Sequence, residues 1–502
     1  MPSLSVIIII AILKCVMNYE TIIGLEVHAQ LLTKSKMFCR CSADYASAPP
    51  NTHVCPVCLG MPGVLPTINK QAVEYTIMTA LALNCTISDY TKFDRRFYFY
   101  PDVAKGYQIS QSDTPIGHHG WLTIEVNGEK KRVGIANVHL EEDVAKLVHR
   151  TSSGGESYSL VDFNRSGAPL MEIVAEPDLR SPEEARQYLI RLRSILRYLG
   201  VSTANMEEGS FRCDANISIR PETSPDSLAK VEVKNMNSFK AVYRALEYEA
   251  RRQRKAVAEG GEIVSHTRGW VEEKGKTVFQ RGKTHALYYP EPNLPPLVLS
   301  REWVEEIRSK LPELPEARHD RFIAEYNLPL YDANLLTSSK AMADYFEACL
   351  KTGVPHSLSS AKRAKMVSNW LSGEFSRLLN ATNTEIDNSK VSPEQLCLLL
   401  DLVHQASISG TSAKLVFEEM FNTGKLADDI IAQQGLSQIS DTEVIEREVM
   451  AAIRNNAQAV ADYKAGRRQS LKFLVGQVMR ACRGRANPRL VNELLEEKLE
   501  EG

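Results

Sequence analysis

Four cysteines near the N-terminus constrain the fold of this chain more than any other feature. They form two pairs, Cys39-x-Cys41 and Cys55-x-x-Cys58, with thirteen residues between them. This spacing lets four thiolates converge on one tetrahedral metal ion, and such a closed site leaves no coordination position for a substrate. The pattern predicts a structural zinc site. The alternatives are two reduced cysteine pairs in a core, or His53 in place of one ligand.

The length and net charge of the chain are typical of an ordinary protein of two or three domains. A chain of 502 residues has room for two or three domains, and a net charge of −2 shows no overall basic excess that would demand a nucleic-acid partner. The other cysteines are scattered singly, which is typical of a reducing compartment. We therefore expect a cytoplasmic protein.

The N-terminal segment resembles the apolar centre of a signal peptide but lacks its other parts. Residues 4–13 are almost entirely aliphatic, yet no basic residue precedes them and no small-residue cleavage site follows. Ten residues are also too few to cross a bilayer. We expect no membrane attachment, and we expect residues 1–16 to be a disordered tail or an extension upstream of a start at Met17.

The periodicity of the sequence changes along the chain. Short alternating runs prevail from Tyr19 to about Pro290, whereas helical periodicity prevails from Arg301 onward, with a proline cluster between them. The sequence predicts an α+β fold with a mixed or antiparallel sheet. We expect one domain with the zinc site over residues 17–295, a helical linker domain over 296–355 and a helical tail domain over 356–502.

Three helices of the first domain have clear start signals. Ser181 precedes Pro182 and two glutamates, and the apolar residues that follow recur at helical spacing as far as Gly200. Asn69 and Ser238 are candidate caps of two further helices, the second of which is expected to end at Gly260. We expect these helices to cover one face of the sheet.

Several strand-like runs carry ionisable side chains on one face. Alternation in residues 23–31 projects Glu26, His28 and Gln30 together, and in residues 138–143 it projects His139 with Glu141 and leaves Glu142 at the strand end. Glu172 stands inside an apolar run, where a buried unpaired carboxylate would cost several kcal/mol. Two further runs place Arg212, Asp214, Asn216, Ser218 and Arg220 on one face of residues 211–220, and Glu232 with Lys234 on one face of residues 231–238.

If these runs belong to one sheet, their shared face fits a divalent metal and a phosphate. Carboxylate oxygens suit Mg²⁺, and a nearby lysine or arginine neutralises a transferring phosphoryl group. For any single strand the alternative is an ordinary solvated face. No complete glycine-rich phosphate loop accompanies these residues, and Gly275-Lys276-Thr277 is better explained as a hairpin tip.

Longer motifs identify a family. Residues 20–28 (ETIIGLEVH), 97–102 (FYFYPD), 107–111 (YQISQ) and 206–216 (MEEGSFRCDAN), together with the paired cysteines, resemble the B subunits of the aspartyl/glutamyl-tRNA amidotransferases. The resemblance runs from about Tyr19 to the C-terminus and implies that residues 17–295 form a catalytic cradle domain. It implies an enzyme that phosphorylates the side-chain carboxylate of Glu-tRNA(Gln) or Asp-tRNA(Asn) with ATP and lets ammonia displace the phosphate.

The resemblance also implies cofactors and partners. The cofactors are ATP, Mg²⁺ and a structural Zn²⁺, and the substrate is a misacylated tRNA. The ammonia comes from the A subunit, an amidase, which forms a heterotrimer with the B subunit and a small C subunit. This fits the absence of an amidase nucleophile motif from the sequence.

The roles of individual residues follow from the same resemblance. The implied Mg²⁺ ligands are His28, Glu142, Glu172 and Asp214, with Glu26, Glu141 and Glu208 as alternative ligands or supporting groups. The implied catalytic residues are Glu142, Asp214, Lys234 and Glu208, and the phosphate or the acyl group is expected to contact Lys234, Asn235, Asn237 and Arg212. Strand alternation alone favours Glu141 over Glu142 as a ligand, and the sequence leaves that choice open.

The C-terminal part carries a concentrated positive charge. Between Lys464 and Arg489 there are eight basic residues and no acidic one. A solvated basic helix that balances the acidic residues 493–501 is the simpler explanation, but the resemblance favours contact with the tRNA backbone. The expected tRNA-binding residues are Lys464, Arg467, Arg468, Lys472, Arg480, Arg483 and Arg485. The alternative function for the whole chain is a non-catalytic, zinc-containing RNA-binding scaffold.

Overall fold

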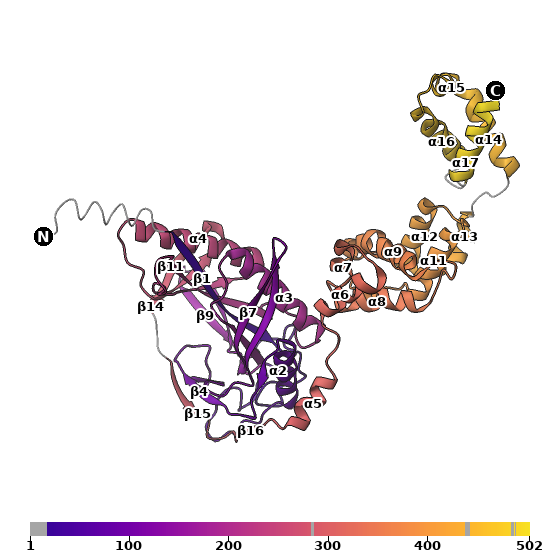
Figure 1. Cartoon of the computed structure of the whole chain (residues 1–502). Coiled ribbons are helices and arrows are strands. Elements are labelled where there is room, and N and C mark those ends of the chain that lie inside the picture. The colour runs from indigo at the N-terminus through magenta and orange to yellow at the C-terminus, as the bar shows by residue number, and fades with distance from the viewer. Residues whose placement is uncertain (1–17, 283–285, 437–441, 483–485, 487, 502) are drawn as a thin grey trace, which may run out of the picture. The chain divides into compact units, whose positions relative to one another are not determined.

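The structure is a computed structural model that describes residues 18–282, 286–436, 442–482, 486 and 488–501 (Figure 1). Contacts divide the chain into two compact units, Met1–Leu314 and Pro315–Gly502. The first unit combines a mixed sheet with helices and the second is helical, which confirms the predicted α+β class followed by helical parts. The domain boundaries expected at residues 295 and 355 stay predictions.

A nine-stranded sheet forms the centre of the first unit. Its strand order is β14-β13-β12-β11-β1-β10-β7-β6-β2, and neighbours are antiparallel except for the parallel pair β12 and β13. In that order the strands are Lys276–Gly282, His266–Val271, Val231–Met236, Phe211–Pro221, Tyr19–Gln30, Pro169–Ala175, Glu129–Glu142, Gly117–Val126 and Thr86–Ile87.

The two faces of this sheet differ because the side chains alternate. In β1, Ile23, Leu25 and Val27 are buried in the main hydrophobic core, whereas Glu26 and His28 project from the opposite face and are only partly buried. Helices cover the apolar face: α2 (Lys70–Ala82) packs on β6 and β7, α3 (Pro182–Tyr198) on β6, and α4 (Phe239–Ala258) on β11 and β12. The opposite, polar face, which carries Glu26 and His28, is therefore the candidate for a functional site.

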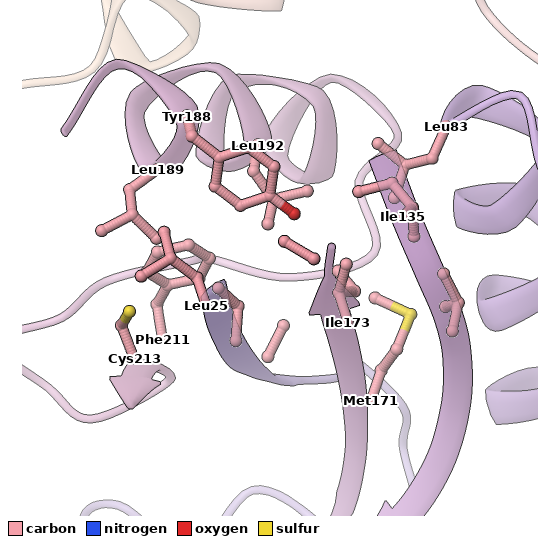
Figure 2. Packing of buried hydrophobic residues seen from close by; sticks show 14 of the residues in the cluster. Leu25, Leu83, Ile135, Met171, Ile173, Tyr188, Leu189, Leu192, Phe211 and Cys213 are labelled. Atoms are coloured by element: carbon pink, nitrogen blue, oxygen red, sulfur yellow. The ribbon is translucent and has the colours of Figure 1, made fainter. Parts of the chain in front are cut away.

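Figure 2 shows how α3 closes the apolar face. Tyr188, Leu189 and Leu192 point from the helix toward strand residues such as Leu25 and Ile173, and all of these side chains are buried. Burial of this apolar area is the main stabilising contribution to the unit.

The predicted helix starts are confirmed. The side chains of Asn69, Ser181 and Ser238 accept hydrogen bonds from the backbone N–H groups of Ala72, Glu184 and Ala241, respectively. Helix α4 ends at Ala258, just before Gly260, whose φ of +81° an L side chain would rarely adopt. Gly275 makes a left-handed turn between β13 and β14, so the Gly-Lys-Thr segment is a hairpin tip as predicted.

Smaller elements complete the first unit. Helix α5 (Arg301–Ser309) lies beyond the proline cluster but contacts α2 and contributes Val304 and Ile307 to the main core of the first unit. The remaining elements are the three-stranded sheet β15 (Leu287–Pro290), β4 (Asp94–Phe97) and β5 (Tyr107–Ser110), the pair β16 (Leu297–Val298) and β3 (Tyr90–Thr91), the hairpin β8 (Lys146–Thr151) and β9 (Ser157–Asp162), and the turn η1 (Glu272–Lys274).

The second unit contains two separate hydrophobic clusters. One is built from α6 (Pro315–Tyr326), α7 (Leu330–Leu336), α8 (Lys340–Lys351), α9 (Ser360–Trp370), η2 (Leu371–Phe375), α10 (Ser376–Thr382), η3 (Ile386–Asn388), α11 (Pro393–His404), α12 (Gly410–Thr423) and α13 (Ala427–Gln434). The other is built from α14 (Thr442–Asn455), α15 (Ala457–Lys464), α16 (Gln469–Ala481) and α17 (Pro488–Glu501). Among the described residues, no helix combines the length and the apolar character needed to cross a membrane.

Candidate metal and phosphate site

Strand order brings the predicted polar residues onto neighbouring strands. β1 lies between β10 and β11, so His28 stands opposite Glu172 on one side and Glu26 stands opposite Asp214 on the other. On the far side of β10, Glu172 stands opposite His139 of β7. The two contacts of β1 join segments that are more than a hundred residues apart in the sequence.

The carboxylate of Glu172 lies at the centre of a compact cluster. Its Oε2 is 3.5 Å from His28 Nε2 and 3.2 Å from His139 Nε2. His139 Nε2 is also 3.6 Å from Glu141 Oε1. Ligand atoms of His28, Glu141 and Glu172 all lie within 4.8 Å of one another, a spacing that one metal ion can bridge.

Burial and charge act against each other in this cluster. Burial lowers the pKa of both imidazoles, but the nearby carboxylates, Glu172 first and then Glu141, together outweigh it and raise the pKa of His28 to about 9 and that of His139 to about 10. Burial would raise the pKa of Glu172, yet the two imidazoles hold it well below its ordinary value. Protons on the imidazoles thus balance the buried carboxylates, and a bound divalent cation could take over that role.

Glu141 and Glu142 face different partners. Glu141 accepts hydrogen bonds from Gln108 Nε2 and Ser110 Oγ, both at 3.0 Å, and these donors hold it beside His139. Glu142 is instead paired with Lys105, and its Oε1 accepts the backbone N–H of Ile109 at 2.9 Å. The geometry therefore brings Glu141, not Glu142, next to His28 and Glu172.

A lysine and several carboxylates extend the polar face across β11 and β12. Lys234 is paired with Asp214 and lies 3.0 Å from Glu232 Oε1. Glu26 accepts a hydrogen bond from Asn216 Nδ2 at 2.8 Å, and burial, reinforced by Glu172, raises its pKa. Apart from Glu208, the acidic residues predicted for the site therefore lie on four adjacent strands.

The other predicted residues lie at the margins. Asn235 and Asn237 are exposed, and Asn235 has a φ of +65° beside a register shift between β11 and β12. Arg212 Nη2 donates to Asp143 Oδ2 at 2.6 Å. Glu208 is on an exposed turn before β11, and within the described part of the chain no hydrogen bond or ion pair joins it to the cluster.

The structure adds residues that the sequence did not single out. A cavity of about 230 Å³ adjoins the acidic face, and Arg96 and Arg281 give it positive charge. Within the described chain, the buried Nε of Arg96 has no hydrogen-bond partner. The other residues that line this cavity are Glu26, Asn216, Lys230, Glu232, Ser265, His266 and Thr267. Arg96 lies in β4, whose polar residues do not alternate, whereas the supporting Gln108 and Ser110 lie on either side of Ile109 in β5, and that alternation was the available signal for these two residues.

The four cysteines converge as their spacing predicted. Sulfur atoms of Cys39, Cys41, Cys55 and Cys58 lie within 4.8 Å of one another, and no disulfide joins these cysteines. His53 is not part of this group, although its backbone carbonyl contacts a neighbouring lysine. Four convergent sulfur donors fit the tetrahedral preference of Zn²⁺.

The predicted RNA-binding residues lie around α15 and α16. Lys464, Arg467, Arg468, Lys472 and Arg480 are all exposed. Arg467 lies 3.3 Å from Asp462, so part of its charge is already balanced. Arg483 and Arg485 lie outside the described residues.

Comparison with known proteins decides the family. Residues 21–305 match the model of the GatB/GatE catalytic domain, and residues 344–499 match that of the GatB domain. The chain belongs to the GatB family. Among relatives named as the B subunit of aspartyl/glutamyl-tRNA(Asn/Gln) amidotransferase, the GatB protein of Dehalococcoides mccartyi is 58% identical over 490 residues, which cover 97% of this chain and all of the relative.

Other bacterial GatB relatives match over the same range. The protein of Caldanaerobacter subterraneus is 53% identical over 486 residues, covering 96% of this chain and all of that relative. The protein of Carboxydothermus hydrogenoformans is 51% identical over 485 residues, covering 96% of this chain and 99% of that relative. The family inferred from the sequence motifs is therefore confirmed.

Proposed function

We propose that this GatB chain is the component of a tRNA-dependent amidotransferase that activates and amidates the amino acid carried by a misacylated tRNA. The substrates are Glu-tRNA(Gln) and Asp-tRNA(Asn), and ATP supplies the phosphoryl group. The observation that carries the proposal is the convergence of His28, Glu141 and Glu172 on the polar face of a sheet in a chain of this family.

The chemistry explains why such a face is needed. A carboxylate resists attack by ammonia because its oxygen is a poor leaving group. In the first step a carboxylate oxygen of the substrate attacks the γ-phosphorus of ATP and ADP leaves, giving an acyl phosphate. In the second step the nitrogen of ammonia attacks the acyl carbon, inorganic phosphate leaves and a proton is lost, which gives the amide.

Residues of the polar face have complementary tasks in this scheme. His28, Glu141 and Glu172 would hold Mg²⁺, with Glu26 and Asp214 beside them as further ligands. Mg²⁺ bound there supplies positive charge to the phosphate oxygens.

The cationic side chains serve the phosphoryl group. Lys234 and the unpartnered guanidinium nitrogen of Arg96 lie where they can stabilise negative charge on it. The sequence-based roles of Glu142, Glu208, Asn235, Asn237 and Arg212 stay predictions.

The cysteine cluster has a structural part in this proposal. A closed zinc site of four thiolates would fold the loop between β1 and α2 and would take no part in catalysis. Zinc content of the purified protein, expected at one ion per chain, tests this assignment separately from catalysis.

The partners follow from the chemistry, and the cytoplasmic location rests on the scattered single cysteines. The chain needs a source of ammonia, which we assign to an amidase, the A subunit of a cytoplasmic heterotrimer that also contains a small C subunit. The exposed basic residues on α15 and α16 would contact the phosphates of the tRNA.

The test is an assay of the co-purified heterotrimer with both misacylated tRNAs and ATP labelled in its γ-phosphate. We expect labelled acyl phosphate that requires Mg²⁺ and misacylated tRNA, and its loss in a His28→Ala variant. A His149→Ala variant is the matched control, because His149 is exposed on the β8–β9 hairpin. If tRNA-dependent ATP consumption is absent, or His28→Ala retains normal activity, the chain fits the non-catalytic scaffold instead.

A further inference from the structure

Lys36 is a completely buried lysine beside the cysteine cluster, and no step of the proposed reaction uses it. Its exposed fraction is 0%. Its Nζ donates to the backbone oxygen of His53 at 2.8 Å, to that of Phe163 at 3.4 Å and to Cys58 Sγ at 3.6 Å. An ammonium group has three N–H donors, so the number of acceptors matches the number of donors.

The charge of Lys36 needs a counter-ion. Burying an unpaired cation is very costly, and within the described residues no carboxylate lies at ion-pair distance from Lys36. Two of its acceptors are neutral carbonyls. The sulfur of Cys58 is the remaining acceptor and can carry a negative charge as a thiolate, and it also accepts the backbone N–H of Cys55 at 3.2 Å.

We propose that Lys36 is a fifth functional member of the cysteine site, a positioning residue that stabilises the Cys58 thiolate and offsets the charge of a bound metal–thiolate centre. The inference rests on the zinc site proposed above. Four thiolates around Zn²⁺ carry a net charge of −2, and a buried ammonium at hydrogen-bond distance reduces the total to −1. Hydrogen bonds from neighbouring groups to the ligands are a general means of tuning such sites.

The same lysine links the cluster to the catalytic sheet. Phe163, whose carbonyl accepts from Lys36, begins the turn of residues 163–168 that leads into β10. In this turn the backbone oxygen of Gly167 accepts from Met37 N at 2.7 Å, and Gly167 N donates to the backbone oxygen of Asp143, next to Glu142, at 2.8 Å.

Gly167 has a backbone conformation that an L side chain rarely adopts, and it lies in van der Waals contact with the cysteine site. With a φ of +84°, its Cβ would lie 3.4 Å from the Cβ of Cys58 and 3.6 Å from Lys36 Cδ. The cysteine site, Lys36 and the end of β7 therefore meet at one turn.

The test measures zinc affinity in full-length variants by competition with a chromophoric chelator. Lys36→Met keeps most of the side-chain volume but removes the charge, and we expect it to weaken zinc binding by about 10- to 100-fold. Lys34→Met is the matched control, because Lys34 is exposed two residues away, and it should leave the affinity unchanged. Wild-type zinc affinity in folded Lys36→Met would overturn the proposal, whereas absence of zinc from the wild-type protein would overturn the zinc site itself.

A second measurement on the wild-type chain covers the case in which Lys36→Met does not fold. Lysines are acetylated with and without prior removal of zinc, and the modified sites are quantified by mass spectrometry. Lys36 should be at least tenfold better protected in the zinc-bound form, while Lys34 should react equally in both. Equal reactivity of Lys36 in the two forms would contradict a link between this lysine and the metal.

Discussion

Glu172 of β10 stands directly opposite His28 of β1, and its carboxylate oxygen lies 3.5 Å from the imidazole Nε2. The next strand places His139 at the opposite register position, 3.2 Å from the same oxygen. One buried carboxylate is thus shared by two imidazoles from different strands. This arrangement makes Glu172 the residue on which the charge balance of the site depends.

Glu172→Gln should abolish most of the activity while leaving the fold intact. The amide keeps the size of the side chain but removes the charge that favours a metal ion and two protonated imidazoles. We expect acyl phosphate formation to fall by at least about 100-fold, comparable to the loss of one transition-state electrostatic contact, and Mg²⁺ affinity to fall with it. Single-turnover assays at increasing Mg²⁺ concentrations measure both effects.

Glu176→Gln is the control for that experiment, since Glu176 follows the same strand but is exposed. The metal-free protein offers an independent measurement by histidine NMR. Because Glu172, together with Glu141, raises the pKa of His139 to about 10, the substitution should shift that titration to lower pH. An unchanged titration together with normal turnover would show that Glu172 is not part of the site.

Lys234→Met should impair the chemical step more than substrate binding. Lys234 is held between Asp214 and Glu232 on the polar face, where it can stabilise charge that develops on the phosphoryl group. We expect kcat to fall by about 100- to 1,000-fold with a smaller change in KM for the tRNA. Lys240→Met on the exposed side of α4 is the control, and equal kcat values for the two variants would exclude a role for Lys234.

The sequence predicted the polar face well because side-chain alternation in a strand has a fixed period of two. This rule was sufficient to place Glu26 with His28, and His139 with Glu141. It was not sufficient to show that β1 inserts between β10 and β11, since strand order depends on long-range packing. The motifs of the family, rather than alternation, therefore joined these strands into one site.

The choice between Glu141 and Glu142 shows where sequence reasoning stops. Both are buried at the end of β7, and only tertiary partners separate them: Gln108 and Ser110 bind Glu141, whereas Lys105 binds Glu142. Arg96 escaped notice for a similar reason. Nothing in its local sequence reveals that its guanidinium Nε is buried without a partner beside a cavity lined by both acidic and basic residues.

Cys55→Ser should damage folding more than it damages turnover of the molecules that remain folded. Structural zinc binding contributes on the order of 10–16 kcal/mol in small modules, so loss of one thiolate removes a large stabilising contribution. We expect less soluble protein and a lower unfolding temperature. A strong chelator should lower the unfolding temperature of the wild-type protein but not that of the variant. A soluble, normally stable variant without activity would contradict the structural role.

Glu249→Gln should make the first unit less stable and less sensitive to acid. Glu249 is fully buried on α4; burial would raise its pKa, but Arg252 and further hydrogen-bond donors outweigh burial and hold the pKa below its ordinary value of 4.5. Its stabilising contribution is therefore complete above pH 4.5 and is lost as the pH falls through the lowered pKa. At pH 7 the substitution should cost about 3 kcal/mol, because it leaves the partly buried Arg252 and Arg268 without their shared carboxylate.

Urea unfolding followed by tryptophan fluorescence between pH 7 and pH 3 measures this effect. The free energy of unfolding should decline more steeply toward low pH in the wild-type protein than in Glu249→Gln. Glu247→Gln provides the matched control, since Glu247 lies on the same helix but is half exposed. Parallel pH dependence in wild type and Glu249→Gln would show that Glu249 does not titrate as described.

Removal of charge from α15 and α16 should change the salt dependence of tRNA binding. Lys464, Lys472 and Arg480 are exposed, and in the described chain no ion pair occupies Lys464 or Lys472. Each phosphate contact contributes about −0.7 to −0.9 to the slope of log affinity against log salt. Replacing all three by Gln should reduce the slope by about 2 to 3 if each residue contacts a phosphate. A charge-matched triple variant of the exposed Lys351, Lys362 and Lys390 should retain the wild-type slope. Because the substitutions lie outside the metal site, amidation at saturating tRNA should stay normal. Equal slopes in the two triple variants would identify the basic residues of α15 and α16 as an ordinary solvated surface.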